Sequence, residues 1–252
     1  MSYSVSERYG HKMIDFTVKL ADIPIGVSVN FESTKVFCSD YLTDEQPLFH
    51  VEVTEKAIAR ECVDIGKEAG NAGCAFSANY LETLALYRAI VEKLIDYNVV
   101  LFHGAAVEVD GQCFIFTARS GTGKTTHIRL WKQLLGDRMS VVNGDKPLLK
   151  VEKYKTTVYG TPWCGKENYG SNTSAALKAI CVLERSETNR IEKTAPADIL
   201  GNLITQTFRP DDTASMIKTL AFLNTLTKNT EFYRLGCNMD ISAAELSYNA
   251  MK

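Results

Sequence analysis

The chain has 252 residues, of which 45% are hydrophobic and 23% charged, the balance of a globular protein long enough for one large domain or two small ones. Its formal net charge of -2 gives no overall basic field, so neither nucleic acid nor an anionic membrane is expected as a partner. Without a signal peptide or an apolar run of ~20 residues, we expect a soluble cytoplasmic protein.

Cysteine and histidine usage also narrows the class of protein. The seven cysteines are never closer than twelve positions, and the four histidines show no H-E-x-x-H spacing. An odd number of widely spaced cysteines suits reduced thiols better than a disulfide framework. A zinc site built from protein side chains is likewise not expected.

The first 98 residues are predicted to form a β-rich accessory region that ends in a long helix. Turn residues separate short β-prone segments, as in the strands of a small sheet; these segments are 13–18, 25–31, 35–38 and 48–53. A helical pattern then covers 79–98, where Asn98 suits the C-terminal end.

Residues 99–252 are predicted to form an α/β core with a mixed sheet. Asp110-Gly111 is a strong hairpin signal between two apolar segments. Strands are predicted at 99–109, 112–118, 139–143, 147–151, 156–160, 177–184 and 231–235. Helices are predicted at 124–135, 197–207 and 214–226, and from the capping box that starts at Ser242.

A glycine-rich loop between a predicted strand and a predicted helix indicates a phosphate loop. The stretch 114–126 reads FIFTARSGTGKTT, in which Ala118 takes the position of the first glycine of G-x-x-x-x-G-K-[ST]. Alanine is tolerated there if its φ is negative. Backbone N–H groups and the helix N-terminus would hold an anion. The nucleotide-binding residues predicted here are Arg119, Ser120, Gly121, Thr122, Gly123, Lys124, Thr125 and Thr126.

Lys124 is expected to reach the β- and γ-phosphates, and the Thr125 hydroxyl to join a magnesium ion. Asp145 follows twenty-one positions after Lys124, just beyond one helix and one strand. A carboxylate at that strand end can hold Mg²⁺ directly or through water. The alternative is an ordinary turn aspartate before Pro147.

These residues resemble the HPr kinase/phosphorylase and phosphoenolpyruvate carboxykinase superfamily. The resemblance rests on HGAAVEVDGQCFIFTARSGTGKTT, on VVNGDKP and on GTPWCGKENYGSN, and it covers roughly residues 99–185. It implies a mixed-sheet phosphate-loop core, the cofactors ATP and Mg²⁺, and phosphoryl transfer. Matched position by position, it makes Lys124 the phosphate-binding lysine, Asp145 one member of an acidic pair, and His103 the histidine of the HPr-kinase type.

The chain departs from the family at the acidic pair, because Asp145 stands between Gly144 and Lys146. One carboxylate cannot easily both bind the metal and accept the proton of the attacking hydroxyl. Either Asp145 holds the metal and His103 accepts the proton, or the site binds nucleotide without efficient transfer. A buried structural histidine is the alternative for His103.

The secondary candidate is Lys166, which lies in a Gly- and Pro-rich loop that could carry it to the transferring phosphate, although a solvated turn lysine is an equal alternative. Cys164 and His127 are expected to be structural.

The leading hypothesis is an ATP- and Mg²⁺-dependent kinase of the HPr-kinase-like type, acting on a hydroxyl such as a serine of a small protein or peptide. The rivals are a non-catalytic nucleotide-binding regulatory module and a small carboxykinase. The acceptor, a phosphorylase back-reaction and a homo-oligomeric state remain open.

Overall fold

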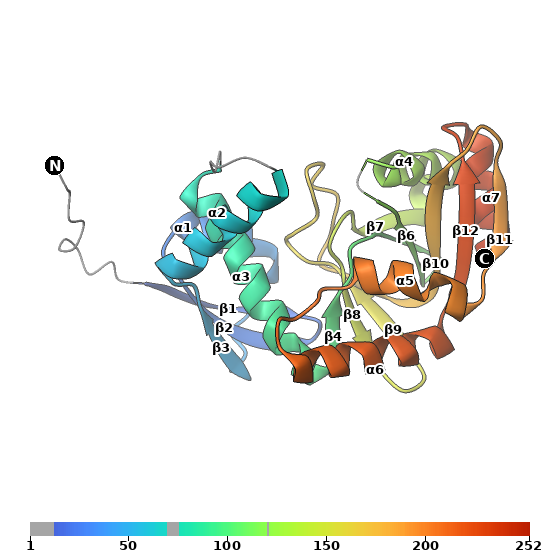
Figure 1. Cartoon of the computed structure of the whole chain (residues 1–252). Helices are drawn as coiled ribbons and strands as arrows, with labels where there is room; N and C mark the ends of the chain where they lie inside the picture. Colours follow the sequence, from blue (N-terminus) through green and yellow to red (C-terminus); the bar gives the residue numbers. More distant parts are fainter. Residues whose placement is uncertain (1–12, 70–75, 120) are drawn as a thin grey trace. The chain divides into compact units, whose positions relative to one another are not determined.

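The structure is a computed structural model that describes residues 13–69, 76–119 and 121–252. These residues divide into two compact units, one of residues 13–19 and 23–90 and one of residues 20–22 and 91–252 (Figure 1). Each unit is described by itself below. Whether the functional boundary lies at 98/99 remains a prediction.

The first unit has more helical than strand residues in its described part, so the β-rich composition predicted for this region is wrong. Its three strands are ordered β1-β2-β3, with β2 and β3 parallel, and β2 is buried along its whole length. The strands are β1 (Ile14–Leu20), β2 (Ile23–Val29) and β3 (Phe49–Glu52). The helices are α1 (Glu32–Phe37), η1 (Ser39–Tyr41), α2 (Glu55–Ala69) and α3 (Ala78–Leu94) as far as Ile90. The last residues of α3 and η2 (Ile95–Tyr97) belong to the second unit.

The strand predicted at 35–38 is wrong, because this segment lies in and just after α1. The reason is a long-range contact that local propensity does not contain. The fully buried carboxylate of Glu82, on α3, accepts hydrogen bonds from the Phe31 amide at 3.1 Å and the Thr34 hydroxyl at 2.6 Å. These bonds satisfy donors at the start of the helix. Helix α2 was also not predicted.

The second unit is built on a mixed sheet, which in the described part of the chain has nine strands in the order β4-β8-β9-β10-β6-β5-β7, with β12 pairing β10 and β11. The central strand β10 runs parallel to β6 and β12 and antiparallel to β9. The strands are β4 (Val99–Leu101), β5 (Ala105–Val109), β6 (Gln112–Thr117), β7 (Met139–Asn143), β8 (Leu148–Val151), β9 (Thr156–Tyr159), β10 (Ser174–Arg185), β11 (Arg190–Lys193) and β12 (Glu231–Cys237). This confirms a mixed α/β fold.

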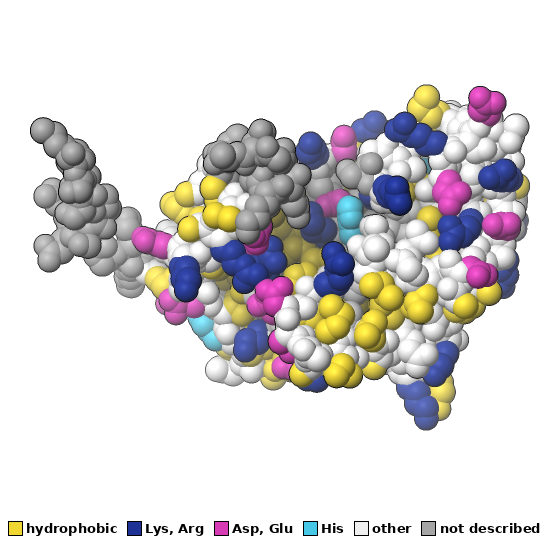
Figure 2. Space-filling model, viewed as in Figure 1, with side chains coloured by type: hydrophobic (Ala, Val, Ile, Leu, Met, Phe, Trp, Pro, Cys, Tyr) yellow, Lys and Arg dark blue, Asp and Glu magenta, His cyan; other side chains and the backbone are white. Residues whose placement is uncertain are grey.

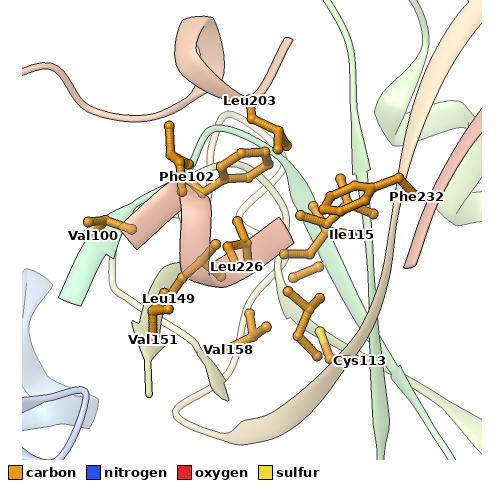
Figure 3. Packing of buried hydrophobic residues seen from close by; sticks show 14 of the residues in the cluster. Val100, Phe102, Cys113, Ile115, Leu149, Val151, Val158, Leu203, Leu226 and Phe232 are labelled. Atoms are coloured by element: carbon orange, nitrogen blue, oxygen red, sulfur yellow. The ribbon is translucent and has the colours of Figure 1, made fainter. Parts of the chain in front are cut away.

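Two hydrophobic clusters, one on each face of this sheet, explain its helix layers. Successive residues of β6 point to opposite faces, so Cys113 and Ile115 join one cluster while Phe114 and Phe116 join the other. The first cluster is covered by α5 (Pro196–Gln206) and α6 (Thr213–Asn229), and Figure 3 shows its rings and aliphatic side chains interleaved. The second is covered by α4 (Lys124–Leu135, followed by η3, Gly136–Arg138) and α7 (Ile241–Met251).

Most predicted elements of this unit are confirmed within a few residues, with three differences. The strand predicted at 99–109 is wrong as one element, because the chain breaks at 102–104 into β4, which pairs with β8, and β5, which pairs with β6. Helix α7 is capped not by Ser242 but by Asp240, whose carboxylate accepts a hydrogen bond from the Ser242 amide at 2.9 Å. Strand β11 was not predicted, because its four residues are mostly exposed and carry no apolar alternation.

Strand direction brings five connections to one edge of the sheet. β5 is antiparallel to both β6 and β7, so β6 and β7 run the same way and end at the same edge. The chain enters β5 at that edge, through residues 103–104. The loops after β10 and β12 also leave from it, since both strands are parallel to β6. Ligands of open α/β sheets bind at the carboxyl ends of their strands.

Figure 2 shows basic and acidic side chains interspersed on one face, with hydrophobic side chains gathered over α5 and α6. Leu200, Ile217 and Leu220 of these helices are 40%, 62% and 45% exposed. None of the described helices is long and apolar enough to span a membrane.

Candidate functional site

The glycine-rich loop joins the end of β6 to the first turn of α4. Gly121 and Gly123 have φ values of 78° and 123°, in the left-handed region that favours glycine. The Thr122 amide donates to the Arg119 carbonyl at 3.2 Å, which tightens the turn. Ser120, predicted to bind phosphate, lies outside the described residues. Ala118 has no positive φ, so alanine fits the place of the missing first glycine.

Lys124 lies at the first position of α4 and is half-buried. Its Nζ donates to the Ala118 carbonyl at 3.3 Å, across the mouth of the loop. Burial lowers the pKa of Lys124; the carboxylate of Asp145 opposes this shift and the positive charge of Lys146 adds to it. The loop lysine is therefore in electrostatic contact with the turn that follows β7.

Asp145 is bonded to two nitrogen donors. Its Oδ1 lies 3.1 Å from His103 Nε2, and its Oδ2 accepts a hydrogen bond from Lys146 Nζ at 2.6 Å. Burial by itself would raise the pKa of Asp145, but the hydrogen bond from His103 and the charge of Lys146 outweigh it, so the pKa lies well below its ordinary value. The carboxylate is ionised at neutral pH and holds both neighbours.

The backbone of this turn is fixed by a buried amide that sequence analysis missed. Asn143 is fully buried, and its Oδ1 accepts from the amides of Asp145 at 2.9 Å and Lys146 at 2.7 Å. Its Nδ2 donates to the Thr161 hydroxyl at 2.9 Å, and that hydroxyl donates to the Lys146 carbonyl at 3.0 Å. An asparagine just before Gly-Asp is the signal of such a side-chain turn.

The segment 160–170 closes over the same turn. The Gly144 amide donates to the Tyr169 carbonyl at 2.7 Å, and a Cβ added to Gly165 would lie 3.0 Å from Asp145 Cβ. Lys166 follows directly and is exposed. Cys164 donates to the Asn168 side chain at 3.3 Å, and burial raises the pKa of its thiol, with the charge of Asp145 adding to the rise. The expectation of a structural thiol agrees with these contacts.

Two cavities flank the glycine-rich loop, and both are lined by Thr122, Leu183 and Arg185. The first, of about 650 Å³, is enclosed by side chains of α4 and of the ends of β10 and β12, among them Leu130 and Met239. The second, of about 690 Å³, is more polar, with lining residues that include Arg119, Asn202, Gln206 and Arg234. Arg185 also donates to the Gly121 carbonyl at 2.5 Å, a contact that sequence analysis did not foresee.

His127 lines the first cavity, and its hydrogen-bonding neighbours are consistent with a proton on Nε2. Trp131 Nε1 can only donate, and it donates to Ser247 Oγ at 2.8 Å; that hydroxyl donates in turn to the Ala243 carbonyl. The remaining lone pair of Ser247 therefore accepts from His127 Nε2–H, at 3.1 Å. Nδ1 is left as a buried acceptor with no partner. Burial lowers the pKa of His127 to about 4, so the ring is neutral.

The donor set for a magnesium ion is sparse. Within the part of the chain that the structure describes, no three His, Cys, Asp or Glu side chains come together as metal ligands. Thr125 is half-buried, on the first turn of α4, and its hydroxyl makes no hydrogen bond to a described residue. A metal at Asp145 would share Oδ2 with the Lys146 ammonium or replace it, since each carboxylate oxygen has two lone pairs. The set suits a cation that brings its own phosphate and water ligands, as Mg²⁺ does.

Comparisons with known proteins do not assign this chain to a family. No protein-family model and no curated protein sequence matches the chain. Solved structures give 47 matching chains. Among them is the HPr(Ser) kinase/phosphatase from Coxiella burnetii, with 14% identity, 51% of this chain and 92% of that chain covered, and a TM-score of 0.29. A TM-score this low carries no inference about function.

Proposed function

We propose that the chain binds ATP with Mg²⁺ and transfers its terminal phosphoryl group to a hydroxyl acceptor. The observation that carries the proposal is the convergence of the loop lysine, Lys124, with His103 and Asp145 at the carboxyl edge of the sheet. The predicted residues come from three separate connections, after β6, before β5 and after β7. A chance glycine-rich turn would not require this convergence.

The phosphates would occupy the loop, because its glycines and the start of α4 supply backbone N–H groups and partial positive charge. Lys124 would leave the Ala118 carbonyl, at 3.3 Å, for the β- and γ-phosphates. The nucleoside would extend into the first cavity, where Leu130 and Met239 offer apolar walls. His127 Nδ1 would accept a hydrogen bond from a ring amino group or a ribose hydroxyl there.

His103 would accept the proton of the acceptor hydroxyl. With Nε2 donating to Asp145, the carboxylate orients the ring, and Nδ1 keeps its lone pair for the proton. This arrangement gives Asp145 a positioning role that does not need a second carboxylate. Mg²⁺ would neutralise phosphate charge, with Thr125 and Asp145 as its protein ligands. A serine of a small protein or peptide stays our proposal for the acceptor.

The test is ADP production from Mg-ATP by the full chain, followed by ³¹P NMR in the presence of candidate hydroxyl acceptors. Lys124→Met should lower the rate at least about 100-fold, since the lysine neutralises charge on the transferring group. Lys228→Met, which removes an exposed lysine from the last turn of α6, is the matched control and should keep the wild-type rate.

The non-catalytic rival is favoured by one observation, the occupation of both Asp145 oxygens by protein donors. His103→Gln separates the two functions. The kinase predicts that this variant binds ATP as the wild type does but loses about 10²- to 10⁴-fold in transfer, the usual contribution of base catalysis. A wild-type protein that binds Mg-ATP and turns over none of it with any acceptor supports the module instead.

A further inference from the structure

Lys146 stands where the resemblance leads one to expect a second acid, and it changes the charge of the site. Its ammonium lies 2.6 Å from Asp145 Oδ2 and is felt electrostatically by Lys124. The charges of Asp145 and Lys146 both act on Lys124, so two ammonium groups lie near this turn. A cluster with more positive than negative charge attracts an anion.

The turn holds the Lys146 backbone and leaves its side chain room to move. Asn143 Oδ1 accepts from the Lys146 amide at 2.7 Å, and the Lys146 carbonyl accepts from the Thr161 hydroxyl at 3.0 Å. The Lys146 side chain is 37% exposed, against 22% for Asp145. Because the backbone is fixed and the four-carbon side chain is flexible, the ammonium can exchange one nearby anionic partner for another without a change in the backbone.

We propose that Lys146 is a second phosphate-binding cation, which leaves the Asp145 carboxylate for the terminal phosphate of a nucleoside triphosphate when that ligand binds. The proposal rests on the proposed function. A terminal phosphate carries more charge than one carboxylate and offers three acceptor oxygens to the three N–H donors of a lysine. The exchange also frees Oδ2 of Asp145 for a metal ligand or a water.

This assignment predicts that the effect of Lys146 depends on the third phosphate. Lys124 is set against the inner and terminal phosphates from the start of α4, whereas Lys146 reaches the site from the turn after β7. Loss of Lys146 should therefore weaken binding of a triphosphate and leave a diphosphate almost unaffected.

The experiment is calorimetric titration of the full chain with ADP and with the β,γ-imido analogue of ATP, both with Mg²⁺. Lys146→Met should weaken the analogue about 10- to 100-fold, the range of a charge-assisted hydrogen bond, and ADP less than about 3-fold. Lys146→Arg keeps the charge and should recover most of the loss. Lys155→Met removes an exposed lysine of the same unit and should bind both nucleotides as the wild type does.

Five results would overturn the assignment. Equal effects on both nucleotides, or no effect with a lowered melting temperature, would make Lys146 only a structural partner of Asp145. Tighter binding of the analogue by Lys146→Met would mean that the lysine blocks the carboxylate. If Lys124→Met weakens binding and Lys146→Met does not, the proposed function stands without this inference; if the wild type binds neither nucleotide, both fail.

Discussion

Asn143→Ala is expected to destabilise the second unit by about 3 kcal/mol. The substitution removes one oxygen that accepts from two backbone amides, those of Asp145 and Lys146, and one NH₂ group that donates to Thr161. Each buried donor left without an acceptor costs about 1–3 kcal/mol. The two losses share one site and are not fully additive, which places the total below the middle of the combined range of about 2–6 kcal/mol.

Urea unfolding followed by circular dichroism measures this change in the free energy of unfolding. Asn224→Ala is the control, because Asn224 is exposed on α6 and its replacement should change stability by no more than about 0.5 kcal/mol. A loss below about 1 kcal/mol for Asn143→Ala would refute the claim that this side chain fixes the turn. Such a result would mean that water replaces its hydrogen bonds.

Three further predictions follow from buried or crowded positions. His127 has a folded-state pKa of about 4, below its ordinary value of about 6.5, so the unfolded chain binds more protons between these pH values. The wild type should therefore lose roughly 3 kcal/mol relative to His127→Gln as the pH falls from 6.5 to 4, and parallel pH profiles in urea unfolding would contradict this. Gly160→Ala should cost about 3 kcal/mol, because its Cβ would lie 1.9 Å from the Ser171 carbonyl oxygen. Gly201→Ala, on α5 with open space around the added Cβ, should stabilise the protein by about 0.5–1 kcal/mol. Melting temperatures measure the change in stability of both glycine variants. A change of the same sign in both variants would count against the packing described here.

The second unit could be predicted from sequence better than the first. Its strands have apolar runs, its hairpin has Asp110-Gly111 with φ values of 52° and 82°, and α4 ends at Gly136 with a positive φ. These signals depend only on neighbouring residues, and in natural proteins such local preferences agree with the folded structure. In the first unit, α1 begins on a carboxylate from α3, Glu82, which no window of the sequence around residues 30–38 contains.

The sequence suggests which residues form the candidate site, and that choice stays a prediction, whereas their side-chain contacts could not be predicted. Strand ends imply that the loop lysine and Asp145 lie at the same edge of the sheet, and the charge of Asp145 acts on the pKa of Lys124 by opposing the lowering that burial causes. The ion pair between Asp145 and Lys146, and the contact of Arg185 with the loop, depend on side-chain directions that spacing does not specify. The predicted roles of these residues, including Lys166, remain predictions.

The most direct test of the central claim is hydrogen–deuterium exchange of the full chain with and without Mg-ATP. A nucleotide held by the glycine-rich loop would protect the amides of 118–127 and of 143–146, and leave those of α3 unchanged. Protection that spares both site segments, or no protection at saturating ATP, would contradict a nucleotide site at the carboxyl edge of this sheet.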